Sequence, residues 1–322
     1  MATGTTTKTQ IDNINSFYSR DLLIRVQPLL VHNKFGMVKD IPKNNSDVIK
    51  FRRYANLSAA TTPLVEGVTP NGSQLSKTDI SATLNYYGDY VTLTDKLTME
   101  TEDPVRMETN EILADQAGDT LDQLTRDIIV AGTSVIYAGS GNTATADVAA
   151  GDVITSANLI TAEETLKANK ARYMTTFVDP STGISTQPLP PCFIGICHTY
   201  TTKTLRAMTD WVKVETYAQP SARMMGEIGK HGDIRFIETV NAKVFTGAGT
   251  GSIDVYATLI LAKYAYGTSR LAGAALQNIV KPLGSGGTSD PLNQRETSGW
   301  KASHTAVILN DAFMVRIEHA RV

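Results

Sequence analysis

The longest periodic pattern of apolar residues lies within residues 103–132 and predicts a long helix. Its apolar positions recur at steps of four, four, three and four, which places them on one helical face. They are Leu113, Ala117, Leu121, Leu124 and Ile128. The polar positions that fall mostly off this face are Asp115, Asp119, Asp122, Gln123 and Arg126.

The residues at both ends of this segment are typical of helix boundaries. Asp103-Pro104 combines a capping side chain with the residue best tolerated at the first helical position. Gly132 is a typical C-terminal cap. At 1.5 Å per residue the helix would be roughly 40 Å long, so we expect other elements to pack across it.

Alternation of apolar and polar residues predicts a hairpin arm over residues 48–95. Ile49 and Phe51 alternate with polar neighbours, and residues 80–86 and 91–94 alternate in the same way. Residues 63–76 between the strands are rich in turn formers, and we expect the tip at 66–76 to be polar, without a large apolar group. Gly88 predicts a bulge or bend. The arm would be roughly 50–60 Å long. A two-stranded ribbon is marginal alone, so this one should lie on its own domain or on another copy.

The remaining elements are shorter and follow no regular βαβ succession, which indicates an α+β fold. We expect helices at 15–30, 156–172 and 201–214. We expect strands at 133–138, 192–197, 234–237, 253–265 and 313–318, and loops at 139–151, 179–191 and 283–300.

Composition excludes several classes of protein. A net charge of -2 over 322 residues argues against a surface that coats DNA by charge alone. Two cysteines, Cys192 and Cys197, exclude a disulfide framework, and their apolar surroundings favour buried, reduced thiols. We see neither a signal peptide nor an apolar run long enough to span a bilayer, so we expect folding in a reducing cytoplasm and no membrane partner.

The sequence shows no set of residues with the spacing of a metal, cofactor or catalytic site, and we expect none. The five histidines form no zinc-binding pair. His198 follows a predicted buried strand, where it could mark an active site or simply close the strand. Gly247, Gly249 and Gly251 lack the spacing and the following helix of a phosphate-binding loop.

Two groups of charged residues could meet each other. One is acidic and lies near the start of the long helix: Glu100, Glu102, Asp103, Glu108 and Glu111. The other is basic and lies at the root of the arm: Lys50, Arg52 and Arg53. They are either solvated faces or the two halves of a charge clamp between copies of the chain.

Short motifs in a fixed order along nearly the whole chain resemble one family, the major capsid proteins of tailed bacteriophages. Within that family they resemble the short-tailed phage branch, which has the Hong Kong 97-like fold. The motifs are Phe35-Gly36, Ile41-Pro42, residues 51–54, residues 63–70, Tyr87-Gly88, Thr94-Asp95, Asp103-Pro104, residues 120–122, Gly132-Thr133, Tyr217-Ala218, residues 226–229, residues 235–239 and residues 299–301.

The resemblance implies an α+β fold with an N-terminal arm, an extended hairpin loop, a peripheral domain built on a long spine helix, and an axial domain. The corresponding segments would be 1–47 for the N-terminal arm, 48–95 for the extended loop, 96–190 for the peripheral domain, 191–281 for the axial domain and 282–322 for a C-terminal return strand of the peripheral domain.

It also implies a structural function without enzymatic activity. Hexamers and pentamers of the chain would form an icosahedral shell around packaged double-stranded DNA, in a virion assembled in the bacterial cytoplasm. Expected partners are a portal protein, a separate scaffolding protein, a decoration protein and, through weak non-specific contact, DNA. Candidate intersubunit residues are Arg52, Arg53, Glu66, Lys77, Glu100, Glu102, Glu108 and Glu111.

Two other functions remain open from the residues alone. One is a soluble α+β enzyme with a site near His198, and the other is an extracellular or virion-surface β-rich binding protein. Particle size separates them from a shell subunit, because a shell contains hundreds of copies whereas an enzyme elutes as a small oligomer.

Overall fold

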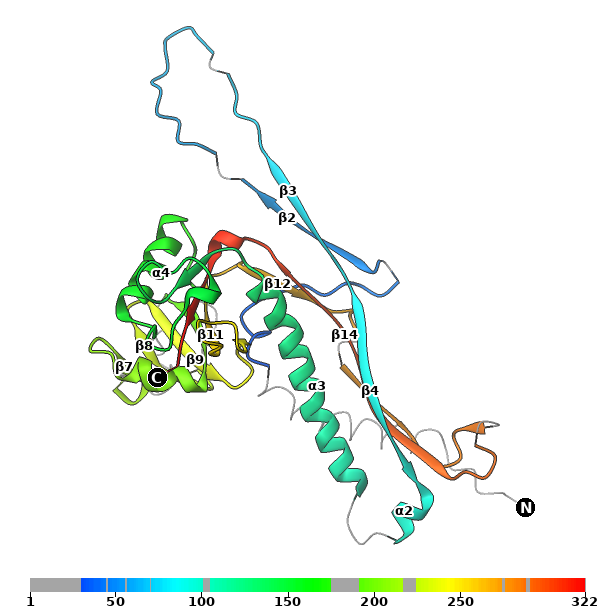
Figure 1. Ribbon diagram of the computed structural model, residues 1–322. Helices are drawn as coiled ribbons and strands as arrows, with labels where there is room; N and C mark the ends of the chain where they lie inside the picture. Colours follow the sequence, from blue (N-terminus) through cyan, green and yellow to red (C-terminus); the bar gives the residue numbers. More distant parts are fainter. Residues whose placement is uncertain are drawn as a thin grey trace, which may run out of the picture.

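The computed structural model confirms the predicted α+β class and describes residues 30–44, 46–55, 57–69, 71–100, 105–174, 191–216, 224–273, 276–287 and 290–321. The helix expected at 15–30, the Asp103-Pro104 helix start and most of the loop at 179–191 lie outside these residues. A long helix and an elongated sheet extend away from a second, more compact sheet, and the hairpin arm projects from their junction (Figure 1).

The predicted long helix is confirmed as α3 (Val105–Val130). Its apolar face is rotated from the predicted one at the C-terminal end, where Thr125 and Ile129 are buried instead of Leu124 and Ile128. Asp122, expected on the polar side, is fully buried. Its partner, His32, lies 90 residues away, so helical periodicity alone could not have identified it.

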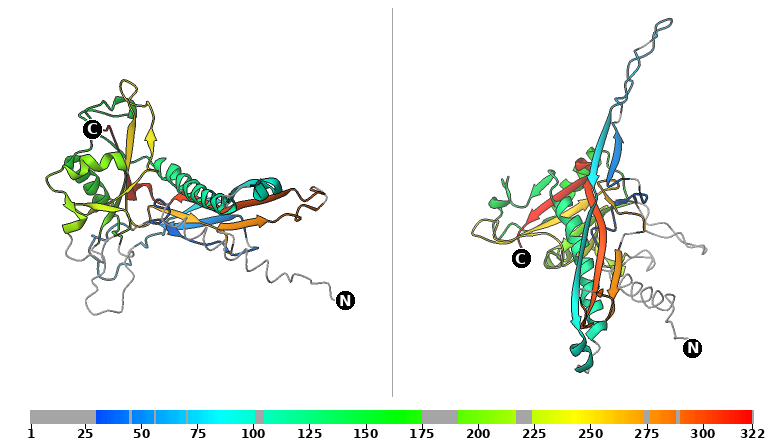
Figure 2. Two further views of the ribbon diagram at one scale, coloured as in Figure 1. Left: turned by 90° about the horizontal axis from the view of Figure 1, so that it is seen from below. Right: turned by 90° about the vertical axis from the view of Figure 1, so that its right-hand side faces the viewer.

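The elongated sheet has five strands and lies against α3 (Figure 2). Its central strand is β14 (Arg295–Ile308), which pairs with β4 (Asn85–Thr94) on one edge. On the other edge β14 pairs with β13 (Leu276–Lys281) and then with β12 (Tyr266–Ser269), which carries β1 (Met37–Val38). The loop expected at 283–300 therefore ends before Arg295, and Trp300 lies in the middle of a strand.

Gly88 does not form the predicted bulge. The register between β4 and β14 runs without a shift through Gly88 and its partner Lys301. A Cβ atom at Gly88 would instead lie 2.5 Å from the carbonyl oxygen of Trp300. The glycine is therefore explained by the close approach of two strands.

Polar side chains join α3 to β14 along the length of the helix. Near its start, Arg106 Nε donates to Glu296 Oε1 at 3.1 Å, and Ser298 Oγ donates to Asn110 at 2.5 Å. Trp300 Nε1 donates to Gln116 at 3.1 Å, and the Thr125 hydroxyl lies 2.9 Å from His304 Nε2. Apolar packing between these pairs involves Leu113, Ala114, Ala117, Leu121, Trp300 and Ala302.

The compact sheet has eight strands in the order β5-β15-β11-β6-β9-β8-β7, with β10 also paired to β11. Five of these strands confirm predicted ones: β5 (Val135–Tyr137), β6 (Phe193–His198), β9 (Ile234–Thr239), β11 (Val255–Leu261) and β15 (Met314–His319). The others are β7 (Val212–Lys213), β8 (Glu227–His231) and β10 (Val244–Phe245).

Two helices cover one face of the compact sheet. The helix α4 (Ser156–Ala168) buries Leu159 and Leu166 there, whereas Ile160 is exposed. The predicted helix at 201–214 is reduced to α5 (Thr202–Arg206) with short 3₁₀ turns on either side at Thr199–Thr201 and Val214–Thr216. Both cysteines are buried and unpaired.

The C-terminal end of α3 lies between the two sheets. Ile129 and Val130 pack with Tyr266 of one sheet and Ile196 of the other in a single core cluster. Arg316 of β15 donates to the carbonyl oxygens of Val130 and Gly132, where a cation also stabilises the end of the helix dipole. The long helix is thus fixed to the compact sheet at this end.

The two sheets divide the sequence differently from the expected domain boundaries. Residues 266–281 supply β12 and β13 to the elongated sheet, although they fall in the expected 191–281 segment. The last strand, β15, belongs to the compact sheet. Outside the two sheets and the hairpin arm, the described part of the chain also contains α2 (Asp95–Glu100) and 3₁₀ turns at Thr145–Asp147 and Asp311–Phe313.

Candidate functional site

The hairpin arm is formed by β2 (Val48–Tyr54) and β3 (Lys77–Thr83). The strands pair in register from Val48↔Thr83 to Tyr54↔Lys77, whereas the segment expected as its last part forms β4 in the elongated sheet. We therefore use "the arm" for residues 48–83. It projects away from both sheets (Figures 1 and 2).

The root of the arm is fixed to the elongated sheet. Phe51 is buried, and its ring packs against Gly267 of β12. A Cβ atom added to Gly267 would lie 3.1 Å from the nearest carbon of that ring. Ala82 and Leu84 are buried beside it. The alternating pattern of the two strands thus places one face of the ribbon on its own chain, but only at the root.

Beyond the paired strands, the arm exposes apolar side chains. We expected a polar tip without large apolar groups, and the structure corrects this. Leu64 is 80% exposed, and other large apolar residues share this environment. They are Leu57, Val65, Val68 and Leu75. Such a group on a projecting segment is typical of a surface that another molecule covers.

The basic group at the root of the arm already has a partner on the arm itself. Arg52 Nε donates to Asp79 Oδ1 at 2.8 Å, directly across the ribbon. The hydrogen bond from Arg52 lowers the pKa of Asp79. Sequence reasoning missed Asp79, although the alternation of charges on the two predicted strands was a usable signal. Arg53, Glu66 and Lys77 are exposed on the arm.

The acidic residues near α3 are only partly gathered. Glu108 and Glu111 are exposed on α3, and Glu100 is exposed at the end of α2, 3.8 Å from Lys96. Glu102 and Asp103 lie outside the described residues. The structure therefore places three of the five expected carboxylates near the same end of the helix.

A shallow groove along the outer side of α3 adds acidic residues that the sequence did not single out. Its volume is about 580 Å³. Ile112 is its exposed apolar residue, and the carboxylates of Asp115, Asp119 and Asp127 are spaced along it. Gln123 and Leu124 complete much of its wall. Four-residue spacing of carboxylates on the predicted helix could have identified this face.

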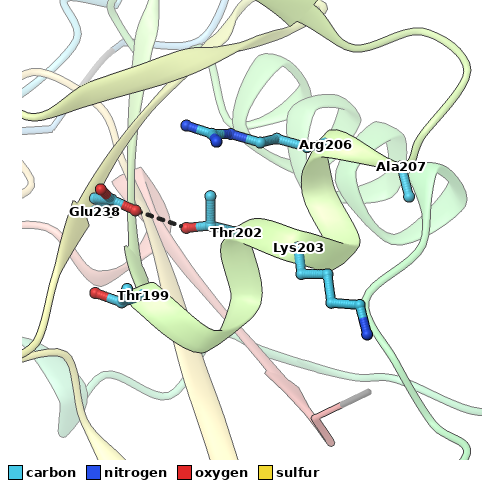
Figure 3. Close-up of a pocket in the computed structure, with 6 residues that line it drawn as sticks. All are labelled: Thr199, Thr202, Lys203, Arg206, Ala207 and Glu238. Atoms are coloured by element: carbon cyan, nitrogen blue, oxygen red, sulfur yellow. Dashed lines mark hydrogen bonds between the residues drawn. The ribbon is translucent and has the colours of Figure 1, made fainter.

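A second hollow of about 620 Å³ lies beside α5 (Figure 3). The Thr202 hydroxyl donates to Glu238 at 2.9 Å, and the Arg206 side chain extends above this pair. Lys203 points the other way (Figure 3). The hydrogen bond from Thr202 joins the start of α5 to β9.

His198 has the environment of a structural residue. Its Nδ1 accepts a hydrogen bond from the Tyr200 backbone N–H at 3.1 Å, and its ring packs near those of Tyr200 and Tyr256. Burial, with a smaller effect of Arg321, lowers its pKa. Among the described residues there is no group of three or more potential metal-ligating side chains. None of the described helices combines the length and apolar character needed to span a membrane.

No protein-family model matches the sequence, and no curated protein matches it. The structure, in contrast, is similar to solved phage capsids. The Ralstonia phage GP4 capsid has a TM-score of 0.65 at 13% identity, covering 88% of this chain and 87% of that one. The cyanophage Pam1 capsid has a TM-score of 0.63 at 16% identity, covering 92% of this chain and 92% of that one. The cyanophage P-SCSP1u capsid has a TM-score of 0.61 at 14% identity, covering 91% of this chain and 89% of that one. This chain therefore has the fold of tailed-phage capsid proteins.

Proposed function

We propose that this chain is the major capsid protein of a tailed bacteriophage and has a structural, non-enzymatic function. Hexamers and pentamers of it would form the icosahedral shell that encloses packaged double-stranded DNA. The observation that carries this proposal is the combination of the capsid fold with a projecting arm whose apolar side chains lie in solvent in the single chain. A repeated assembly would cover them.

In this proposal α3 is the spine helix of a peripheral domain, and most of the compact sheet is the axial domain at the centre of each capsomer. The arm is the extended loop that reaches a neighbouring subunit. A portal protein, a separate scaffolding protein and possible decoration proteins complete the set of partners, and DNA is contacted weakly and without specificity. Assembly would take place in the host cytoplasm.

The groove of α3 is the surface that we assign to the neighbour's arm. Asp115 and Asp119 complement the basic residues Lys50, Arg53 and Lys77, and Ile112 offers an apolar contact. Asp127 is already paired with Arg126 and Lys243 of its own chain. Exposed ion pairs add little individually, so apolar contact must supply most of the free energy. Burying ~500 Å² of apolar surface would contribute on the order of 10 kcal/mol before the costs of ordering and association.

Among the candidate residues, Arg53 fits the intersubunit contact better than Arg52. Arg53 is exposed and has no ion pair within the described part of the chain, whereas Arg52 is already paired with Asp79. Lys77 and Glu66 lie on the same projecting arm. Glu100, Glu108 and Glu111 are the carboxylates toward the start of α3 that could extend the contact, together with Glu102.

The test is the size and shape of the purified protein. Sedimentation velocity and negative-stain electron microscopy should show closed particles of uniform diameter at high protein concentration or with co-expressed scaffolding protein. A chain that remains a small oligomer under both conditions would contradict the proposal. A chemical activity assigned to the surroundings of His198 would instead favour the enzyme.

A further inference from the structure

Residues 30–41 join α3 to the sheet beside the root of the arm, and we call this segment the strap. The first contact that holds it on α3 is a buried pair of side chains. The backbone N–H of His32 donates to Asp122 Oδ1 at 2.7 Å, and His32 Nδ1 lies 2.7 Å from Asp122 Oδ2. Both side chains are completely buried. Two contacts to one carboxylate hold the strap firmly against the middle of α3.

A second set of contacts holds the strap about one turn further along the helix. The Thr125 hydroxyl is 2.6 Å from Asn33 Oδ1 and 2.9 Å from His304 Nε2, so it joins the strap, α3 and β14. Asn33 Nδ2 also donates to the Leu121 carbonyl at 3.2 Å. Burial lowers the pKa of His304 to about 4, so the imidazole is neutral near pH 7 and the junction carries no buried positive charge.

The other end of the strap contacts the strand on which the arm rests. Met37 and Val38 pair with Gly267 and Thr268 of β12. The Ile41 backbone N–H donates to the Arg270 carbonyl at 2.9 Å. Gly267 is also the residue against which Phe51 of the arm packs. One strand therefore carries both the strap and the root of the arm.

Tyr266, the first residue of β12, contacts the strap at two points. Its hydroxyl donates to the His32 carbonyl oxygen. Its ring lies against Gly36, where a Cβ atom would approach it to 2.6 Å. Because burial raises the pKa of Tyr266, the phenol remains a donor. A movement of α3 at Asp122 can therefore reach β12 through the hydrogen bonds of His32 to Asp122 and to Tyr266.

The groove of α3 lies on the outer side of the same stretch of helix. Asp119 and Gln123 line the groove, whereas Asp122 and Thr125, on a different side of the helix, hold the strap. We propose that the strap transmits the position of α3 to the root of the arm, so that the occupant of one subunit's groove orients the arm of that subunit. The role in assembly rests on the proposed function, but the coupling itself is a property of the single chain.

Two threonines on α3 provide a matched test. The hydroxyls of both Thr120 and Thr125 contact the carbonyl four residues earlier, but among the described contacts only that of Thr125 also reaches Asn33 and His304. Hydrogen exchange followed by mass spectrometry is compared for the wild-type subunit, Thr125→Val, Thr120→Val and His32→Ala, each in the unassembled state. Circular dichroism checks that the helix content is retained.

We expect Thr125→Val and His32→Ala to speed exchange about tenfold in residues 30–41 and also in residues 48–54 and 77–83, as local opening of a linked unit requires. Thr120→Val should leave all three segments unchanged. Faster exchange confined to the strap would overturn the proposal, as would an equal effect of Thr120→Val. If His32→Ala reduces helix content, the comparison of the two valine variants decides.

This experiment is independent of shell formation. A chain that never assembles would contradict the proposed function but leave the exchange result intact. Conversely, the chain could form normal shells while Thr125→Val leaves hydrogen exchange in the arm unchanged. That result would support the proposed function and contradict the coupling.

Discussion

The guanidinium of Arg52 lies 2.8 Å from the carboxylate of Asp79 on the facing strand of the arm. The pair makes Arg52 part of the arm's own structure, so its reversal should act inside the subunit. Arg52→Glu would place two carboxylates directly opposite each other. We expect a looser arm and a higher concentration threshold for assembly, measured by sedimentation.

The exchanged pair is the control for this prediction. Arg52→Asp combined with Asp79→Arg restores opposite charges across the ribbon and should return the threshold close to that of the wild type. If the exchanged pair assembles no better than Arg52→Glu, Arg52 contacts another subunit after all.

Arg53 should behave differently, because we assign it to the acidic groove of a neighbour. Arg53→Glu is expected to raise the assembly threshold while the unassembled subunit keeps its melting temperature. The difference from the wild type should shrink with added salt, since exposed charges are screened. Arg53→Lys retains the charge and serves as the control. A threshold unchanged at low salt would contradict the assignment.

Shortening the arm tests whether it acts between subunits. Replacing residues 57–75 by a short Gly-Ser turn removes the exposed apolar residues and keeps the paired strands. We expect a folded subunit with near-native helix content by circular dichroism, which fails to form closed, stable shells under the electron microscope. Normal shells would show that the arm is not an intersubunit element, and an unfolded chain would show that the arm stabilises its own subunit.

Two buried histidines should make the subunit sensitive to acid. Burial lowers the pKa values of His304 and His319 to about 4, from an ordinary 6.5. Between these values the unfolded chain binds protons that the folded chain does not, so stability falls as the pH drops from 6.5 toward 4. Each histidine would contribute a loss on the order of 3 kcal/mol.

The measurement is urea unfolding of the unassembled subunit at about pH 7 and about pH 4.5, which brackets most of this window. His319→Gln removes one titrating group and should clearly reduce the pH dependence, whatever its effect at neutral pH, while His304 and His198 continue to contribute. An unchanged pH dependence in this variant would rule out His319 as a source of the acid sensitivity.

His198 should matter for stability and not for chemistry. His198→Ala removes the acceptor for the Tyr200 N–H and part of an aromatic cluster. We expect a loss of ~1–2 kcal/mol in the free energy of unfolding, with assembly and DNA retention unchanged. Loss of a measurable chemical activity in normal particles would contradict this view and favour the enzyme.

The elements that the sequence predicted well are those that carry their own periodicity. The helix at α3 and the strands β2, β6 and β15 each bury one face or both faces against neighbours, so the apolar pattern was sufficient. In contrast, β14 was taken for a loop up to Trp300. Its polar residues Glu296, Ser298 and His304 have partners on α3, so its alternation is hidden.

The candidate site was predicted only in outline. The arm and the acidic helix followed from local patterns, but the partner of Arg52 depends on the register of the ribbon, and the burial of Asp122 depends on a residue 90 positions away. Long-range pairs of this kind leave no local signal. The exposed apolar residues of the arm were visible in the sequence, but they were masked by the surrounding turn formers.

The side-chain pairs between α3 and β14 also limit how the length of this protein can change. From Arg106 to Thr125 the helix advances ~28 Å, and from Glu296 to His304 the strand advances ~26 Å, at 1.5 and 3.3 Å per residue. Four helical residues therefore match two strand residues. A single inserted residue would rotate the rest of the helix by about 100° and separate its partners. Insertions here should be tolerated only as four residues in α3 together with two in β14 and two in each strand paired with it, β4 and β13.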